Sequence, residues 1–194
     1  MPEMNIENIF TVPVASTDLE FDLEKAKNYC YEMKSQSNGR TVSNRKGFQS
    51  TDLQFPNPLS DIAQNVCNAG QSYFEHLNGS KIHRTFLDNM WINISPKGAY
   101  NTIHGHPNCF MSGVLYLKTP ENCGKIWFVH PSEVLEYDWK GHYWKEYNSH
   151  TSAFVYHKVI EKRCYLFPSW LKHGVEENNS EEDRISISFN IRIE

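Results

Sequence analysis

The sequence lacks the features of membrane and nucleic-acid-binding proteins. No window approaches the ~18 consecutive apolar residues that span a membrane. The 19 Lys and Arg residues form no basic stretch and are outnumbered by 23 Asp and Glu, so nucleic acid is not an expected partner. The first ten residues have neither the basic nor the apolar segment of a secretory signal, and we therefore expect a cytoplasmic protein.

The sequence also has few cysteines, and they are poorly arranged for cross-linking. Their number is odd, they are widely spread, and no C-x-x-C pair occurs: Cys30, Cys67, Cys109, Cys123 and Cys164. Neither a disulfide framework nor a structural zinc site is indicated. We expect free thiols with packing roles.

What is present suits one globular domain. A length of 194 residues with 39% hydrophobic residues is enough for a single core. No repeat, low-complexity tract or linker divides the chain. We expect one domain over 1–194, with helical support over about 15–80 and a β core over about 84–193.

The first half predicts two helices. The first is capped by Thr17 or Asp18, ends near 38–39, and has apolar residues at 3.6-residue spacing, namely Leu23, Ala26, Tyr29, Cys30 and Met33. The second begins at Pro58 or Leu59 and stops at Asn78-Gly79, a natural left-handed cap. The connection between them, 35–58, is rich in Ser, Gly, Asn and Pro.

After residue 80 the apolar period switches to two, which predicts strands. The expected ranges are 84–95, 99–106, 111–118, 124–129, 153–160, 162–168 and 184–193. Helices followed by short strands indicate an α+β protein with an antiparallel barrel or sandwich. The helices are expected to buttress the outside of the sheet.

The last predicted strand alternates strictly between polar and apolar residues. One face carries Arg184, Ser186, Ser188, Asn190 and Arg192, and the other carries Ile or Phe. The polar face is expected either to lie in water or to line a site.

Two histidines, His104 and His106, stand two residues apart in a predicted strand. On a strand, side chains at that spacing point the same way and can grip one metal ion. The alternative is two surface histidines that are close by chance.

A third histidine, His173, follows an apolar strand and a proline, and Arg184 follows it by 11 residues. A buried Arg offers a bidentate fork for a dicarboxylate, and the Ser186 hydroxyl faces the same way. His173 could otherwise be an exposed loop histidine.

The sequence resembles a known enzyme family in three motifs. The run from Trp91 to Leu117, W-I-N-I-S-P-K-G-A-Y-N-T-I-H-G-H-P-N-C-F-M-S-G-V-L-Y-L, is followed by F-P-S-W-L-K-H-G-V and R-I-S-I-S-F-N-I. Together they resemble 2-oxoglutarate- and Fe(II)-dependent oxygenases related to prolyl hydroxylases. The likeness extends from Ile9-Phe-Thr-Val-Pro-Val to the end, with its core in 91–193.

The resemblance implies a fold and a set of roles. The fold is a double-stranded β-helix, a jelly-roll or cupin-like barrel, buttressed by the N-terminal helices. The cofactors are Fe(II), 2-oxoglutarate as co-substrate, and O2. His104 and His173 would be metal ligands, and Arg184 with Ser186 would anchor the co-substrate carboxylate. Weaker candidates for co-substrate support are Tyr116, Asn93 and Asn190.

The sequence departs from the family pattern at His106, where most such enzymes have a carboxylate. Three imidazoles would leave the metal site more positive than usual. We expect His104, His106 and His173 to form the metal site. The alternative is that a carboxylate from elsewhere, such as Asp88, completes the triad.

The expected function is that of a dioxygenase that hydroxylates a C–H bond of an unknown substrate and decarboxylates 2-oxoglutarate to succinate. One rival is a zinc-dependent hydrolase or lyase, since three histidines and water also make a catalytic zinc shell. Another is a non-catalytic cupin-like ligand-binding protein. Arg184 and Ser186 argue against zinc chemistry, which needs no dicarboxylate anchor.

The partner is expected to be a small-molecule or peptidyl substrate, and a homodimer is possible. The aromatic segment 131–152 interrupts the strand pattern. It is interpreted either as a hairpin lid or as a packing or subunit contact. Trp91, Trp127 and Trp170 are expected in the core or the pocket wall.

Overall fold

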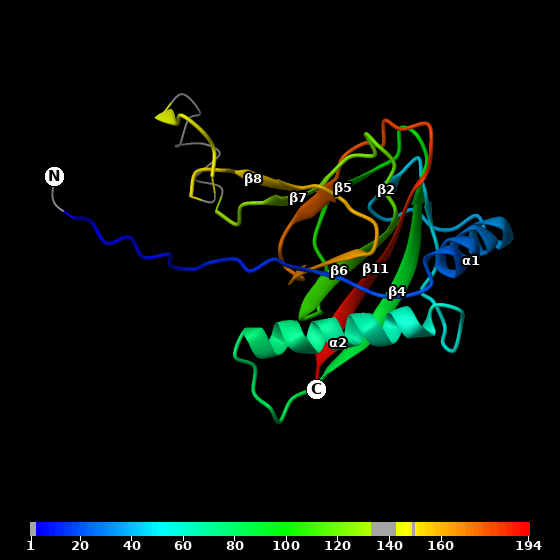
Figure 1. Ribbon diagram of the computed structural model, residues 1–194, viewed down its shortest axis with the longest axis horizontal. Coiled ribbons are helices and arrows are strands. Elements are labelled where there is room, and N and C mark those ends of the chain that lie inside the picture. Colours follow the sequence, from blue (N-terminus) through cyan, green and yellow to red (C-terminus); the bar gives the residue numbers. More distant parts are fainter. Residues whose placement is uncertain (1–2, 133–142, 149) are drawn as a thin grey trace.

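The computed structural model describes residues 3–132, 143–148 and 150–194, and its elements form two antiparallel sheets with helices on one side (Figure 1). The helices are α1 (Leu23–Gln36) and α2 (Ser60–His76). The strands are β1 (Ala15–Asp18), β2 (Asn44–Arg45), β3 (Phe48–Gln49), β4 (Thr85–Ser95), β5 (Tyr100–His104), β6 (Met111–Lys118), β7 (Ile126–Val129), β8 (Phe154–His157), β9 (Arg163–Pro168), β10 (His173–Val175) and β11 (Arg184–Ile193).

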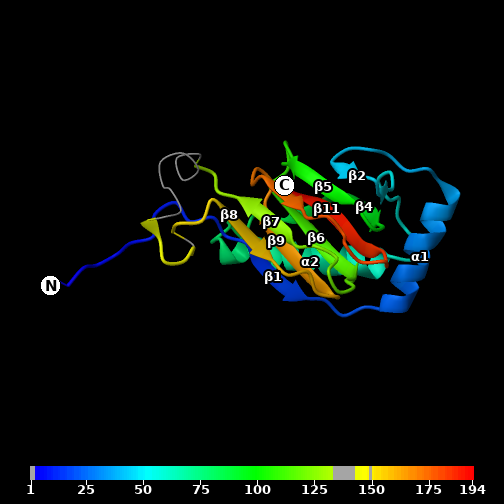
Figure 2. The same cartoon turned by 90° about the horizontal axis from the view of Figure 1, so that it is seen from above.

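The larger sheet has the order β1-β9-β6-β11-β4-β3, and the smaller one has the order β2-β5-β10-β7-β8. Strands distant in sequence are therefore neighbours, as β11 is to both β4 and β6. Figure 2 shows the strands side by side, with α1 at one end of the molecule. The predicted α+β class is confirmed.

The helices cover the outer face of the larger sheet. Ile62 and Val66 of α2 pack with Ile187 and Phe189 of β11, all of them at most 1% exposed, in the main hydrophobic cluster. A second cluster, which includes Phe128 and Phe167, fills the space between the sheets. The apolar face of β11 thus lies against the helices, which leaves its polar face for the interior.

The sequence placed the helices correctly but misjudged one cap. The N-cap of α1 is Asp22, whose carboxylate accepts a hydrogen bond from the Lys25 backbone nitrogen at 3.0 Å, rather than Thr17 or Asp18. Those two residues belong to β1, which pairs with β9. For α2 the cap is Leu59, and Asn78 has the expected left-handed conformation with φ of 63°.

The predicted strand ranges include none in the connection 35–58, but the structure has two short strands there. They are β2, which pairs with β5, and β3, which pairs with β4. Each is only two residues long, which is too short for an alternating pattern to appear in the sequence. Hydrogen bonds from the buried Asn44 side chain to the carbonyls of Arg40 and Gly47 hold this segment folded.

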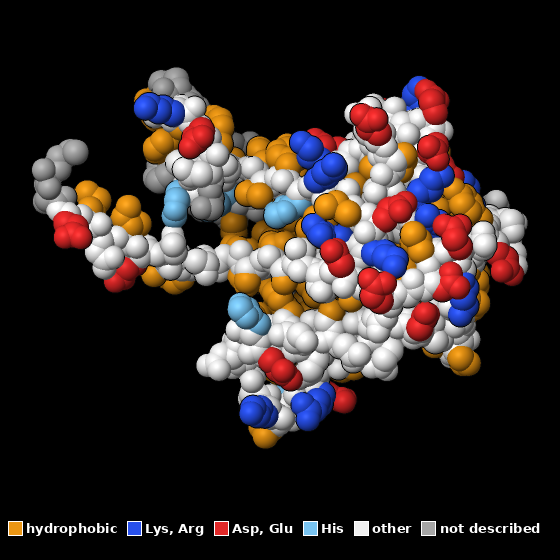
Figure 3. Space-filling model, viewed as in Figure 1, with side chains coloured by type: hydrophobic (Ala, Val, Ile, Leu, Met, Phe, Trp, Pro, Cys, Tyr) orange, Lys and Arg blue, Asp and Glu red, His pale blue; other side chains and the backbone are white. Residues whose placement is uncertain are grey.

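The surface is mixed in charge. Figure 3 shows Lys and Arg interspersed with Asp and Glu over the end of the molecule that carries α1, and orange apolar side chains toward the N-terminal segment. No helix in the described part of the chain is long and apolar enough to cross a membrane. Half of the segment 131–152, for which a lid or contact role was predicted, lies outside the described residues, namely 133–142 and 149.

Candidate metal centre and co-substrate cavity

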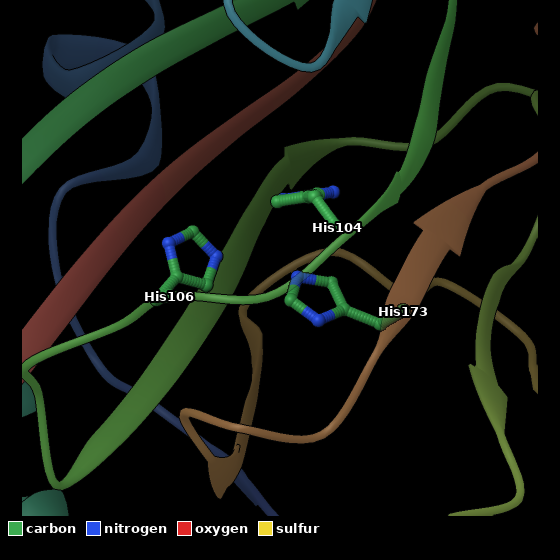
Figure 4. A group of neighbouring side chains, drawn as sticks. All are labelled: His104, His106 and His173. Carbon is green, nitrogen blue, oxygen red and sulfur yellow. The ribbon is translucent and has the colours of Figure 1, made fainter.

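Three histidines converge between the two sheets (Figure 4). His104 ends β5, His173 begins β10, and the two residues are register partners across these strands. His106 lies in the loop after β5 rather than on the strand, which corrects the expectation that both histidines share one strand. Its backbone nitrogen donates to the Ser169 carbonyl at 2.8 Å, which holds the loop against the β9–β10 turn.

The ring geometry leaves room for one ion. One nitrogen from each imidazole lies within 4.8 Å of the others. The Nδ1 atoms of His104 and His173 contact the carbonyls of Thr102 at 2.8 Å and Leu171 at 2.9 Å. A neutral ring that donates from Nδ1 presents its Nε2 lone pair, which is the form that binds a metal.

Burial keeps these rings neutral. It lowers the pKa of His106 to about 4, with a further contribution from His104. It lowers the pKa of His173 to about 3, again assisted by His104. Burial also lowers the pKa of His104 from its ordinary value. Desolvation penalises the charged imidazolium, so all three rings are available as neutral ligands at physiological pH.

A cavity extends from the histidines to Arg184. Its lining includes all three histidines together with Trp91, Asn93, Asn101, Tyr116, Arg184, Ser186 and Ser188. The first part of the polar face of β11, Arg184, Ser186 and Ser188, therefore lines a site instead of facing water. Trp91 forms the wall beside His106, with ring centroids 5.7 Å apart. Trp127 packs against Phe154, and Trp170 is 58% exposed, so Trp170 is neither core nor pocket wall.

A bulge in β5 turns two of its residues toward the cavity. His173 is paired with His104 and Val175 with Asn101, so two steps on β10 match three steps on β5. The extra residue changes the in-and-out alternation. Asn101 and His104 therefore both line the cavity although they are three residues apart. Sequence reasoning missed Asn101 because a bulge leaves no alternation signal.

Arg184 is 2% exposed. Its Nη1 donates to the carbonyl of Cys123 and, at 3.1 Å, to that of Glu176. These bonds hold the guanidinium in one orientation, while Nη2 has no hydrogen-bond partner among the described residues. Burial lowers the pKa of Arg184 from its ordinary value. An arginine side chain ordinarily titrates so far above neutral pH that the guanidinium stays charged.

Two other buried polar atoms on this cavity wall also lack partners in the described structure: the Tyr116 hydroxyl and Asn93 Oδ1. Burial raises the pKa of Tyr116, so its hydroxyl remains a donor. Buried polar groups without partners cost about 1–3 kcal/mol each, and clusters of them point to a missing ligand. Tyr116 on β6 is the register partner of Ser186 on β11, and Arg184 precedes Ser186 by two residues on the same strand.

Two of the candidate residues lie elsewhere. Asn190 does not line the cavity. Its amide oxygen accepts a hydrogen bond from the Ser112 hydroxyl at 2.7 Å, and its amide nitrogen donates to the Asn89 side chain at 2.8 Å. Asp88 pairs with Arg192 at 3.0 Å and is absent from the metal-ligating group found in the described residues. The structure therefore does not support Asp88 as the carboxylate that completes the triad.

The observations fit a metal bound next to an anion. One nitrogen from each of three imidazoles converges at one end of the cavity, and the Arg184 guanidinium with the Tyr116 hydroxyl also lines it. Iron accepts imidazole ligands, and the two unpartnered donors match a carboxylate. These residues suit Fe(II) together with 2-oxoglutarate.

Known structures share this fold. A prolyl-4-hydroxylase from Pseudomonas putida aligns with TM-score 0.64 and 14% identity over 94% of this chain and 93% of that one. HygX from Streptomyces hygroscopicus, solved with nickel and 2-oxoglutarate, aligns with TM-score 0.63 and 12% identity over 94% and 83%. The viral collagen prolyl hydroxylase from Paramecium bursaria Chlorella virus-1 aligns with TM-score 0.58 and 11% identity over 92% and 94%. The predicted double-stranded β-helix is confirmed.

The sequence comparisons give a more specific result. No curated protein matches the chain. The sequence model of the 2OG-Fe(II) oxygenase family matches residues 89–190, which is more than half of the chain and includes all three histidines and Arg184. The chain belongs to the 2OG-Fe(II) oxygenase family, whose members depend on Fe(II) and 2-oxoglutarate.

Proposed function

We propose that the protein hydroxylates a C–H bond, with Fe(II) held by His104, His106 and His173 and 2-oxoglutarate anchored by Arg184. The observation that carries this proposal is the pairing of three convergent imidazoles with unpartnered donors in one cavity. When bound, iron with 2-oxoglutarate and O2 supplies the oxidising power, and 2-oxoglutarate is decarboxylated to succinate.

The residues of the chain position the reactants. The Nδ1 contacts of His104 and His173 with carbonyls fix the two rings and leave Nε2 of each as the atom that would hold the metal. Arg184 Nη2 and the Tyr116 hydroxyl would donate to the distal carboxylate of the co-substrate, and the Ser186 hydroxyl offers a third donor on the same wall. Trp91 and Phe167 exclude water from the sides of the cavity.

Asn93 is a further candidate for contact with the co-substrate. Its Nδ2 donates to the Ser188 hydroxyl at 3.0 Å, and its Oδ1 is unpartnered. A carboxylate only accepts hydrogen bonds, so the amide would have to turn over. Ser188 can accompany that change because a hydroxyl both donates and accepts. Asn190 is bonded within the protein, and we propose a structural role for it.

The proposal favours a small-molecule or peptidyl substrate in the cytoplasm. A zinc hydrolase would leave the Arg184 and Tyr116 donors unused. A non-catalytic binding protein would need no metal site with this donor set. The co-substrate donors and the metal donors in one cavity favour the oxygenase over both.

The decisive experiment is an anaerobic titration of metal-free protein with Fe(II) and then 2-oxoglutarate, monitored through the visible charge-transfer band of a 2-oxoacid chelated to iron. The band is expected in the wild type and is expected to be lost in Arg184→Ala. Arg192→Ala is the matched control, because that arginine lies on the same strand outside the cavity.

Because Arg184 is buried, Arg184→Lys is measured as well, and each variant is checked for folding by circular dichroism. A folded lysine variant is expected to bind 2-oxoglutarate more weakly, since one ammonium cannot reach both carbonyls and the co-substrate. Stoichiometric iron uptake without a band in the wild type would contradict the proposed function.

A further inference from the structure

The cavity contains an excess of positive charge. Arg184 is its one permanently charged lining residue, and no Asp or Glu is among the described residues that line it. A typical iron oxygenase of this type has two histidines and one carboxylate. With His106 in the carboxylate position, all three metal donors are neutral.

The formal charges can be counted, and this count rests on the proposed function. Fe(II) brings two positive charges and Arg184 brings one, while 2-oxoglutarate brings two negative charges. One positive charge remains, where a carboxylate ligand would have left the site neutral. In a partly buried cavity such a charge is poorly screened and attracts anions more strongly than it would in water.

Neither Glu176 nor Asp88 lines the cavity. Glu176 acts on Arg184 electrostatically, but its carboxylate accepts from the Lys125 backbone nitrogen at 2.9 Å and does not line the cavity. Asp88 is paired with Arg192. Both carboxylates are therefore already engaged with other groups.

A second cation, Arg45, lies next to residues that line the cavity without lining it itself. Arg45 Nη1 donates to the carbonyls of Val42 at 3.0 Å and Asn44 at 2.9 Å, and these residues flank the lining residue Ser43. Arg45 is in no ion pair within the described ranges. On β2, Arg45 is the register partner of Tyr100, the residue before Asn101, so a further positive charge lies close to Ser43 and Asn101.

We propose that the primary substrate is an organic anion whose negatively charged group enters this cavity and supplies the charge that a carboxylate ligand would otherwise provide. The group reaches the metal side from the Ser43 edge, where Arg45 adds attraction. The neutral ligand His106 is the determinant of this preference. A carboxylate at position 106 removes the preference, while a neutral amide there keeps it.

The first test uses matched small probes on the anaerobic Fe(II) and 2-oxoglutarate complex at saturating 2-oxoglutarate and constant ionic strength. Acetate and acetamide have the same shape but differ in charge. Acetate is expected to shift the charge-transfer band with an apparent Kd at least about tenfold lower than that of acetamide, which corresponds to about 1.4 kcal/mol. Equal responses to the two probes overturn the proposal.

The second test uses substitutions at the proposed determinant. His106→Asp is expected to form the band but to lose the preference for acetate, whereas His106→Gln is expected to keep it. If the aspartate variant takes up no iron, His106→Glu replaces it. A preference that persists in the acidic variant, or disappears equally in His106→Gln, overturns the proposal because charge would then not be the cause.

The third test asks for the substrate class directly. Organic acids and their amides are screened in matched pairs for stimulation of succinate formation. We expect acids to stimulate it at least tenfold more than their amides, and a neutral amide that surpasses its acid contradicts the proposal. No charge-transfer band at all in the wild type would refute the proposed function itself, whereas a band without anion preference refutes only this inference.

Discussion

His104 and His173 face each other directly across the β5–β10 pairing, with ring centroids 4.3 Å apart. Their backbones are hydrogen-bonded neighbours, so the separation of the two rings is set by the sheet itself. His106 approaches from a loop, with its ring centroid 5.0 Å from His104 and 5.2 Å from His173. Two proposed metal ligands are therefore fixed by strand pairing, and the third depends on the 105–110 loop.

This arrangement predicts unequal effects of ligand removal. His173→Ala and His104→Ala are expected to abolish stoichiometric Fe(II) binding, with affinity at least about 100-fold lower, since loss of even an outer-shell partner can cost 10–100-fold. His106→Ala is expected to weaken binding less, because water can replace a loop ligand. Isothermal titration calorimetry under anaerobic conditions measures each affinity. The exposed His76→Ala serves as the control, and equal binding by all four variants would contradict the proposed metal site.

Tyr116 and Tyr165 provide a matched pair of tyrosines. The Tyr116 hydroxyl has no partner, whereas the Tyr165 hydroxyl donates to the Lys158 carbonyl at 2.7 Å. Tyr116→Phe is expected to raise the Kd for 2-oxoglutarate about 5- to 10-fold without lowering the free energy of unfolding. Tyr165→Phe is expected to cost about 1 kcal/mol of stability and to leave the Kd unchanged. Denaturant titration and the charge-transfer assay distinguish these results, and the opposite pattern would refute the assignment of Tyr116.

Asn190 lies in a buried polar row with Ser112 and Asn89. Asn190→Ala leaves both partners without their bonds and is expected to lower the free energy of unfolding by about 1–3 kcal/mol. The affinity for 2-oxoglutarate is expected to stay within about twofold of wild type, because the residue lies off the cavity. A large loss of 2-oxoglutarate affinity in a folded, stable variant would restore the sequence-based interpretation of Asn190 as a co-substrate contact.

Gly174 follows His173 on β10. The Trp127 ring occupies the space that a side chain at position 174 would need. A Cβ at position 174 would lie 2.8 Å from the indole ring atoms, so the tryptophan would have to move. Gly174→Ala is expected to lower stability by about 1–3 kcal/mol and to weaken Fe(II) binding, since β10 carries His173. Thermal unfolding and iron titration measure the two effects. An alanine variant with wild-type stability and iron affinity would show that Trp127 shifts without cost.

The sequence predicted the long, regular elements and missed the short ones. The alternation over 184–193 is ten residues long and identified β11 with the correct bounds. No strand was predicted around His173, because β10 has only three residues, too few for a period to show. Its strand character comes from pairing with both β5 and β7, which depends on the tertiary fold.

In the candidate site, too, residues within sequence motifs were predicted, whereas those whose role depends on tertiary contacts were not. His104, His173, Arg184 and Ser186 were identified through motif likeness, and the structure brings them to one cavity together with His106. The partners of Asn190 and Asp88 lie on other strands or depend on strand register, so the sequence could not show that both side chains are already engaged. Arg45 carries no sequence signal as a cation close to the cavity, because its position depends on the pairing of β2 with β5.

Strand β11 belongs to the helix-facing core on one side and to the cavity wall on the other. A slip of one residue in its pairing with β4 or β6 would turn Ile185 and Ile187 into the cavity and bury Arg184 among apolar side chains. Such a misregistered chain would lose hydrophobic packing and leave a charge without its carbonyl partners at the same time. The register that packs the apolar face of β11 against the helices is therefore the same register that places Arg184 and Ser186 on the co-substrate wall.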